Sequence, residues 1–474
     1  MSVIYPFELP TTGSFSFAES FVDYTDAYTA SIAETTQVRA NLRAILKESK
    51  RTDGEKDHLR LVKVLDEYLP NLHGIMNCAA RSDIVAAKEP DFPFTEVFSW
   101  RTTLSAHLFN NSPRLNLPSL LTELAFTLLT YGFALSNLAH STVISLGTYE
   151  RERGISDIER KAKDEKLGFA VNFLSRASGV FAYVGDVVLV EAEKQERWMS
   201  RLERPPELSK EVCSALSKMT TASAQSLAIR KLLTKSAPHR QMHLECASLC
   251  SSALSLARIP GSSKARLRSP TGKSKLGIGF GKDKDRDSQE VADEMEVSAD
   301  LLRFLTDSAA YNSALAHKWL GVDAGEAPGS ARVGEAVAFL TWSKKELDEL
   351  KESGKRGSKE DGKEGKRERK ERVVEEIESV TAFLRHYKKV NDSLSFQSVP
   401  PLSALQSSIP TGRLAVAVKP YTQPVPAFGP GSVEYMRKQA EEMELLGELA
   451  PKDDGEAVIS LQSAQSYAGA GSYF

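Results

Sequence analysis

Two histidines and two cysteines lie close together in the chain, and both are residue types that bind zinc. His239, His243, Cys246 and Cys250 follow one another at intervals of four, three and four residues. A single helix spreads such a set over about three turns, which is too far apart for one tetrahedral site. Cysteines within an apolar helical pattern are commonly small buried residues. We therefore expect a helix interior here and no bound metal.

An acidic stretch further along matches part of a calcium-binding loop. Asp283, Asp285, Asp287 and Glu294 occupy the first, third, fifth and twelfth positions of that loop. Ser288 stands where the sharp turn of the loop requires glycine. The spacing is therefore better explained by a solvated charged loop than by a calcium site.

A short run resembles the end of a nucleotide-binding loop. Thr271–Ser274 reads TGKS, but the first glycine of the motif would fall at Leu267, so the backbone cradle for phosphate is missing. No nucleophile elbow or metalloprotease helix is present either. We therefore predict no cofactor and no enzymatic activity.

The overall composition describes a reduced protein with a large core. The chain has 474 residues, a hydrophobic share of 41% and a formal net charge of −2. Because its charge is nearly balanced, general attraction to nucleic acid is not expected. It has only four cysteines and no signal-peptide pattern at its start. These features predict a cytoplasmic protein without disulfides.

The strongest structural signal is a pair of long apolar segments in the middle of the chain. Leu120–Gly147 and Leu167–Val188 both place apolar side chains at intervals of three and four, and Thr148–Lys166 between them is highly charged. This pattern predicts two helices that form an antiparallel hairpin. Neither helix could bury its apolar face alone, so further helices must surround them.

The first of these segments also raises the question of a membrane span. Leu124–Leu146 contains no Asp, Glu, Lys or Arg, and about 20 apolar residues suffice to cross a bilayer. However, many polar side chains interrupt it, among them Thr127, Asn137 and His140. Each would need a hydrogen-bond partner in lipid. We therefore favour a buried helix of a helical bundle.

The rest of the chain is also mostly helical by its pattern. The expected helices cover residues 20–50, 56–69, 188–203, 208–234, 289–320, 331–350, 373–390 and 433–449, with another beginning at 238. Two insertions rich in basic residues, 259–288 and 351–372, interrupt this pattern. The first is expected to be a flexible loop, and the second either is disordered or partly extends the flanking helices.

Several motifs resemble the Bro domain family, to which Alix belongs. Glu123–Ala139 (ELAFTLLTYGFALSNLA) and Phe173–Val184 (FLSRASGVFAYV) are similar to the signature hairpin of that family. The stretches Tyr5–Phe17, Asn391–Pro401 and Ile409–Pro424 resemble those of its fungal pH-response members. The resemblance covers roughly residues 1–425.

This resemblance implies the fold and the domain organisation. We expect a mostly α, elongated and boomerang-like Bro domain over residues 1–425, with tetratricopeptide-like hairpins and a small N-terminal β-sheet. Residues 426–474 would form an extension with a short amphipathic helix and a flexible tail.

The resemblance also implies a function and a partner. Bro domains are non-catalytic adaptors whose concave face binds the amphipathic C-terminal helix of an ESCRT-III core filament subunit. In fungi, such an adaptor connects a membrane pH-sensor complex with proteolytic activation of a zinc-finger transcription factor. The protein would then be cytoplasmic and recruited to ESCRT sites at the plasma membrane or endosomes. The alternative is a curved scaffold of the Alix type that acts at membrane surfaces.

The family's contact residues follow an alanine–glutamine pair, which is Ala224-Gln225 in this chain. This chain departs from the family at Ala228, where an aromatic residue is usual. Basic neighbours would pair with acidic residues of the incoming helix, and apolar ones would anchor it. The predicted groove residues are Leu227, Ala228, Ile229, Arg230, Lys231, Met242 and Leu244.

Two further contacts are suggested by local sequence. The basic insertions could meet anionic lipid, although a solvated loop is the simpler interpretation. Tyr5–Leu9 (YPFEL) fits a loose peptide motif that Alix-like proteins bind, but apolar extended termini usually pack on their own domain. We interpret it as a packing segment.

Overall fold

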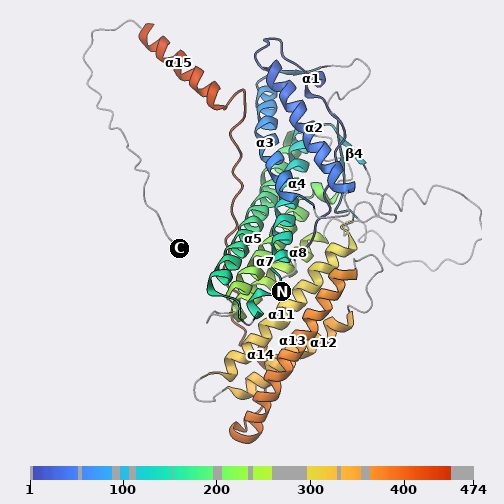
Figure 1. Ribbon diagram of the computed structural model, residues 1–474, viewed down its shortest axis with the longest axis vertical. Coiled ribbons are helices and arrows are strands. Elements are labelled where there is room, and N and C mark those ends of the chain that lie inside the picture. Colours follow the sequence, from blue (N-terminus) through green and yellow to red (C-terminus); the bar gives the residue numbers. More distant parts are fainter. Residues whose placement is uncertain are drawn as a thin grey trace, which may run out of the picture.

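Helices stacked side by side make up a long body, with α1, α2 and α3 at one end and α11, α12 and α13 at the other (Figure 1). The computed structural model describes residues 4–51, 56–87, 97–105, 114–152, 154–195, 205–232, 239–258, 296–327, 332–353 and 363–449. The mostly helical, elongated fold predicted from the sequence is confirmed.

The helices alternate in direction and pack mainly against their neighbours in sequence. Their bounds are α1 Phe17–Ser20, α2 Thr29–Arg51, α3 His58–Ala80, α4 Leu120–Leu146, α5 Asp157–Tyr183, α6 Leu189–Gln195, α7 Lys210–Leu232, α8 His239–Ala257, α11 Ala299–Gly325, α12 Val333–Ser353, α13 Lys363–Val390, α14 Leu402–Gln406 and α15 Val433–Leu449. Short π-helical turns join α5 to α6 at Val184–Val188 and follow α13 at Asn391–Ser395.

The described β-structure is small and lies near the N-terminal helices. Strands β1 (Phe21–Val22) and β2 (Val85–Ala86) pair antiparallel, as do β3 (Phe98–Arg101) and β4 (Arg114–Leu117). Phe98 and Trp100 of β3 point into the core while their neighbours are partly exposed. This alternation is typical of a strand with one buried face.

The central helical hairpin predicted from the sequence is confirmed by α4 and α5, which pack against each other. A side-chain carbon on Gly132 of α4 would lie 2.4 Å from the ring of Phe181 on α5. Glycine at this position therefore allows the close approach of the two helices. The charged connection is shorter than expected, because Ser156 caps α5 and Asp157 and Glu159 occupy its favourable first turn.

The long apolar segments serve as core helices. Most side chains of α4 are buried, including those of the polar residues Thr127, Thr130 and Ser136. Among the described residues, Asp157–Gln195 is long and apolar enough by composition to cross a membrane, but 61% of its apolar window is buried in the body. Core helices of large helical domains have this composition.

Helix α3 continues beyond the end predicted at residue 69. It runs through Pro70 to Ala80, and its apolar face continues with the fully buried Leu72 and Ile75. Burial of two such side chains contributes about 3 to 6 kcal/mol, which offsets the roughly 3 kcal/mol penalty of an internal proline. Tertiary packing therefore overrides the local signal.

The N-terminal arm packs along the hairpin, as predicted for Tyr5–Leu9. The side chain of Asn137 on α4 accepts from the backbone N–H of Phe7 and donates to its carbonyl, both at 2.8 Å. The Phe7 ring stacks on Phe133 with centroids 4.6 Å apart. Ile4, Phe7 and Leu9 are all buried.

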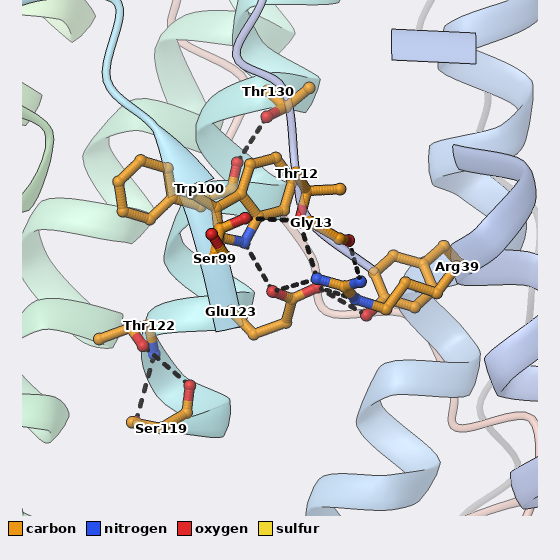
Figure 2. A network of polar contacts seen from close by, with 11 residues as sticks. Thr12, Gly13, Arg39, Ser99, Trp100, Ser119, Thr122, Glu123 and Thr130 are labelled. Carbon is orange, nitrogen blue, oxygen red and sulfur yellow. Dashed lines mark hydrogen bonds and ion pairs between the residues drawn. The ribbon is translucent and has the colours of Figure 1, made fainter. Parts of the chain in front are cut away.

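A buried carboxylate, Glu123 in the first turn of α4, connects the arm with α2, α3 and β3 (Figure 2). Its Oε1 accepts from Arg39 Nε and from the Tyr68 hydroxyl, both at 2.8 Å. Its Oε2 accepts from Trp100 Nε1 at 2.6 Å and from Arg39 Nη2 at 3.2 Å. Arg39 also donates to the Gly13 carbonyl at 3.0 Å.

This network is fully enclosed, because the side chains of Arg39 and Glu123 are 1% and 0% exposed. Buried charges are tolerated only when paired and hydrogen-bonded. The Glu123 carboxylate favours the charged form of Arg39 and keeps the pKa of the guanidinium raised. The arm, α2, α3 and β3 are thus held in one arrangement by a single side chain.

Removing the charge of Glu123 tests this dependence. We expect Glu123→Gln to lower the free energy of unfolding by about 3 to 5 kcal/mol, because Arg39 would remain buried without its counter-ion. Chemical denaturation monitored by circular dichroism measures the change. Glu48→Gln is the matched control, since Glu48 pairs with Arg60 at the surface with 63% of its side chain exposed. This pair should contribute less than about 1 kcal/mol, and equal effects of the two variants would contradict the role of Glu123.

Candidate partner-binding face and its covering strap

A mostly extended segment after α13 runs along the body from α12 to α3 (Figure 1). We call it the strap (Phe396–Ser432); it contains one short helix, α14. It forms no sheet among the described residues, so its backbone groups bond to helices and side chains. Three of its backbone N–H groups donate to helix carbonyls. Arg413 donates to Gln241 of α8 at 3.0 Å, Lys419 to Ser175 of α5 at 3.2 Å and Ala427 to Pro70 of α3 at 3.0 Å.

Glycines lie on helices where the strap passes closest. A side-chain carbon on Gly179 of α5 would lie 1.8 Å from the carbonyl oxygen of Lys419, and one on Gly334 of α12 would lie 2.4 Å from the carbonyl oxygen of Ser398. Any side chain there would displace the strap backbone. Gly179 belongs to the FLSRASGVFAYV motif, so part of that motif serves to seat the strap.

The glutamine of the Ala224-Gln225 pair binds the strap. Gln225 is fully buried, and its amide donates to the carbonyl of Arg413 at 2.7 Å and accepts from the N–H of Ala415 at 2.8 Å. One side chain therefore satisfies both backbone groups, as a neighbouring strand would. Gln225, from which the predicted groove residues were located, is thus bonded to the strap of the same chain.

Most of the predicted groove residues lie inside the body. Leu227 packs against the end of the central hairpin, and Ile229 and Met242 pack between α7 and α8. Their exposures are 0%, 3% and 2%. Their apolar spacing reflects helix packing, so these side chains are not available to a partner on this surface.

Arg230 also points inward. It pairs with Glu150 through two hydrogen bonds of 2.8 Å and donates to the carbonyl of Gly147. Both side chains are less than a tenth exposed, and the Arg230 guanidinium lies over the Tyr149 ring. Arg230 therefore holds α7 to the turn after α4 and cannot also pair with an incoming helix.

The accessible part of the predicted face is smaller and includes residues of the strap. Ala228 and Leu244 are half-buried and Lys231 is exposed. The strap adds Leu414, which is 47% exposed, and the exposed side chain of Arg413. Sequence reasoning missed both, because nothing in the local pattern indicates which helices an extended segment will cross.

The histidines and cysteines of α8 point to separate neighbours. His239 packs on the Trp319 ring with centroids 5.0 Å apart, and His243 Nδ1 lies 3.2 Å from Asn312 Oδ1. Cys246 and Cys250 are free and buried. In the part of the chain that the structure describes, no cluster of His, Cys, Asp or Glu has the arrangement of a metal site.

The first basic insertion, 259–288, lies outside the described residues. So do the phosphate-like motif within it and the calcium-like motif Asp283–Glu294. In the second insertion, α12 extends to Ser353 and α13 begins at Lys363, so this insertion partly extends its flanking helices. Contact of either insertion with anionic lipid stays a prediction.

Comparison with known proteins places the chain in a family. The family model for the BRO1-like domain matches residues 17–464. The chain belongs to the BRO1-like domain family. It is 33% identical over 521 residues to the pH-response regulator protein palC of Cryptococcus neoformans var. neoformans serotype D (strain B-3501A), covering 99% of both chains. It is 24% identical over 466 residues to the palC of Yarrowia lipolytica (strain CLIB 122 / E 150), covering 89% of this chain and 94% of that protein.

Solved structures share the BRO1-like fold. ALIX in complex with the SIVmac239 PYKEVTEDL late domain superposes with a TM-score of 0.59 at 15% identity, over 94% of this chain and 54% of that chain. The chain thus spans about half of that ALIX chain. The ALIX BRO1 CHMP4C complex gives a TM-score of 0.55 at 17% identity, over 91% of this chain and 99% of that chain.

The BRO1-like match extends beyond the predicted boundary at residue 425. Phe428 packs against Gly74, and the Tyr435 hydroxyl accepts from Arg81 at 2.6 Å. Contacts with α3 and the residue that follows it are therefore made both by the strap and by the start of α15. The division at 425 stays a prediction.

Gln225 offers a direct test of how the strap is held. Gln225→Met should increase hydrogen exchange of the strap around Ala415 about tenfold or more, because two hydrogen bonds worth roughly 1 kcal/mol each are lost. Hydrogen exchange with mass spectrometry measures the protection. Gln195→Met is the control, because Gln195 is exposed and its amide donates to Glu191 within the same helix turn. Unchanged protection in the Gln225 variant would show that other contacts hold the strap.

A buried histidine holds the strap near its end. The Gln423 amide donates to Nδ1 of His73 at 2.7 Å, so this nitrogen carries no proton. Burial lowers the pKa of His73 to about 4. Protonation would place a charge in the core and replace the acceptor of Gln423 with a donor.

The pH dependence of stability follows from this shift. The unfolded state binds the His73 proton below pH 6.5 but the folded state only near pH 4, so stability is full above pH 6.5 and declines as the pH falls toward 4. We expect His73→Asn, which keeps an acceptor for Gln423, to remove about 3 kcal/mol of this acid-dependent loss. Urea unfolding at pH 7 and pH 4 measures it. The control is His386→Asn, at an exposed site, which should leave the acid-dependent loss unchanged. If His73→Asn also left this loss unchanged, His73 would not be its cause.

Proposed function

We propose that this protein is a non-catalytic adaptor of fungal ambient-pH signalling that binds an ESCRT-III core subunit. The observation that carries the proposal is its similarity to palC pH-response regulators over almost the full length of both chains. In this role it links a membrane pH-sensor complex to proteolytic activation of a zinc-finger transcription factor. It acts in the cytoplasm and is recruited to ESCRT sites at the plasma membrane or endosomes.

The proposed partner segment is the C-terminal amphipathic helix of the ESCRT-III subunit. The fold is shared with ALIX BRO1, which has been solved in complex with CHMP4C, an ESCRT-III subunit. A helix binds to a surface through apolar anchors spaced by three and four residues, with charges at the rim. The α7–α8 face beside the strap offers both kinds of group.

The apolar part of the proposed site consists of Ala228, Leu244 and Leu414. Ala228 packs against the buried Ile229 and Met242, so it rests on a well-packed base. Leu414 lies between the two strap residues that Gln225 holds. Rigidly supported apolar groups lose little entropy when they bind a partner.

The proposed rim is basic. Lys231 lies one helical turn beyond Ala228, and Arg413 lies on the strap; both side chains are exposed. In the described part of the chain neither of them has an ion-pair partner. They are therefore free to pair with acidic residues of an incoming helix, the role that sequence reasoning assigned in part to Arg230.

Substitution of accessible residues separates binding from folding. Leu244→Asp and Leu414→Asp should each weaken binding of the ESCRT-III C-terminal helix at least tenfold, because a charge would replace an apolar anchor. Calorimetry with the intact protein and the synthetic helix measures the affinity. The unfolding midpoint should change by no more than about 2 °C, as for other surface substitutions.

Ile158→Asp is the matched control, because Ile158 is apolar and 85% exposed at the far start of α5. It should bind like the wild type. If the wild-type protein fails to bind while another Bro domain binds the same helix, the ESCRT-III proposal is wrong. If the wild type binds and the two leucine variants bind with the same affinity, the partner occupies a different face.

A further inference from the structure

A concavity of about 260 Å³ lies between the strap and three helices, away from the α7–α8 face. The helices contribute Leu69 of α3, Tyr131 of α4 and Val180 of α5 to its lining, and the strap contributes residues 419–422 and 424. Leucine, valine and two prolines provide apolar walls. Its volume is that of a side chain or a small molecule.

Polar groups line one side of this concavity. Arg176 Nη2 donates to the Tyr131 hydroxyl at 2.5 Å, and that hydroxyl donates to Asp66 Oδ1 at 2.7 Å. The Tyr131 hydroxyl therefore donates its proton to Asp66 and has none for a ligand. Nε and Nη1 of Arg176 have no hydrogen-bond partner in the described part of the chain. Arg176 lines the concavity and is partly exposed, so it has donors left for a ligand.

A second cation enters from the strap. Lys419 donates to Asn172 Oδ1 at 2.8 Å and has further donor capacity. Among the described residues, neither Lys419 nor Arg176 has a carboxylate within ion-pair distance. Asp66, the carboxylate among the described lining residues, is linked to Arg176 through the Tyr131 hydroxyl. The local charge is therefore positive.

The hydroxyl of Tyr421 is the third donor. Its oxygen is buried and has no hydrogen-bond partner among the described residues, although its ring packs on Tyr183 with centroids 4.9 Å apart. Burial raises the pKa of Tyr421, so the hydroxyl keeps its proton at neutral pH. A buried donor without an acceptor is unusual in a folded protein, so we expect an ordered water or a ligand oxygen to accept from it.

We propose that this concavity binds an anionic oxygen group, a phosphate or a carboxylate, on a side chain of a partner protein. Arg176 and Lys419 supply the charge, and the Tyr421 hydroxyl donates to a ligand oxygen. Charge-assisted bonds from a guanidinium and an ammonium are the usual way in which proteins hold such groups. The apolar walls contact the stem of the side chain. This site is independent of the proposed ESCRT-III face.

The test compares two anions that differ in chemistry with a neutral analogue. Calorimetry of the intact protein with phenyl phosphate, benzoate and phenol is expected to show binding of at least one anion and none of phenol at the same concentration. Preference for phenyl phosphate identifies a phosphorylated partner residue, and preference for benzoate identifies an acidic one. Binding of neither anion more tightly than phenol overturns the proposal.

Variants locate the binding in this site. Tyr421→Phe removes one oxygen that has no partner in the protein, so it should weaken anion binding about threefold or more without lowering the unfolding midpoint. Arg176→Met should weaken binding at least tenfold. Lys166→Met removes an exposed charge elsewhere on α5 and should change nothing. Wild-type affinity in Tyr421→Phe or Arg176→Met would show that the anion binds elsewhere and would overturn the proposal.

Discussion

The fold depends on one enclosed carboxylate that needs hydrogen-bond donors from distant parts of the chain. Glu123 is fully buried, and an unpaired charge there would be too unfavourable for a stable fold. Its donors come from α2, α3 and β3, and Arg39 extends the network to the N-terminal arm. Satisfying this one group therefore fixes α4 against the whole N-terminal end, and α5 and the later helices stack from there.

The strap meets a different requirement, since its extended backbone must find partners without a sheet. Helix carbonyls and the amide of Gln225 provide them, and the ring nitrogen of His73 accepts from the side chain of Gln423. Close approach is possible where helices carry glycine, as at Gly179 and Gly334. The last part of the chain thereby returns to α3, so that the two ends of a long body are stabilised together.

Much of this architecture could be predicted from the sequence, because periodicity records which face of a helix is apolar. The α4–α5 hairpin and the bounds of α15 (Val433–Leu449) agree with the pattern. Periodicity does not record what covers an apolar face. Leu227 and Met242 would show the same spacing whether a partner or the chain itself buried them, and here the chain does. The end predicted for α3 before Pro70 was wrong for a related reason, since burial beyond the proline is a tertiary effect.

The strap also explains why the sites could not be found by sequence alone. Leu414 and Arg413 lie far from Leu244 in sequence, and Tyr421 lies far from Arg176. Both proposed surfaces exist only where the strap crosses the helices, at α7–α8 and at α3–α5. The contacts that seat the strap, above all those of Gln225 and Gln423, therefore shape the two proposed binding surfaces and also contribute to stability. A segment without periodicity thus supplies part of each proposed site, while the regular helices supply the rigid support.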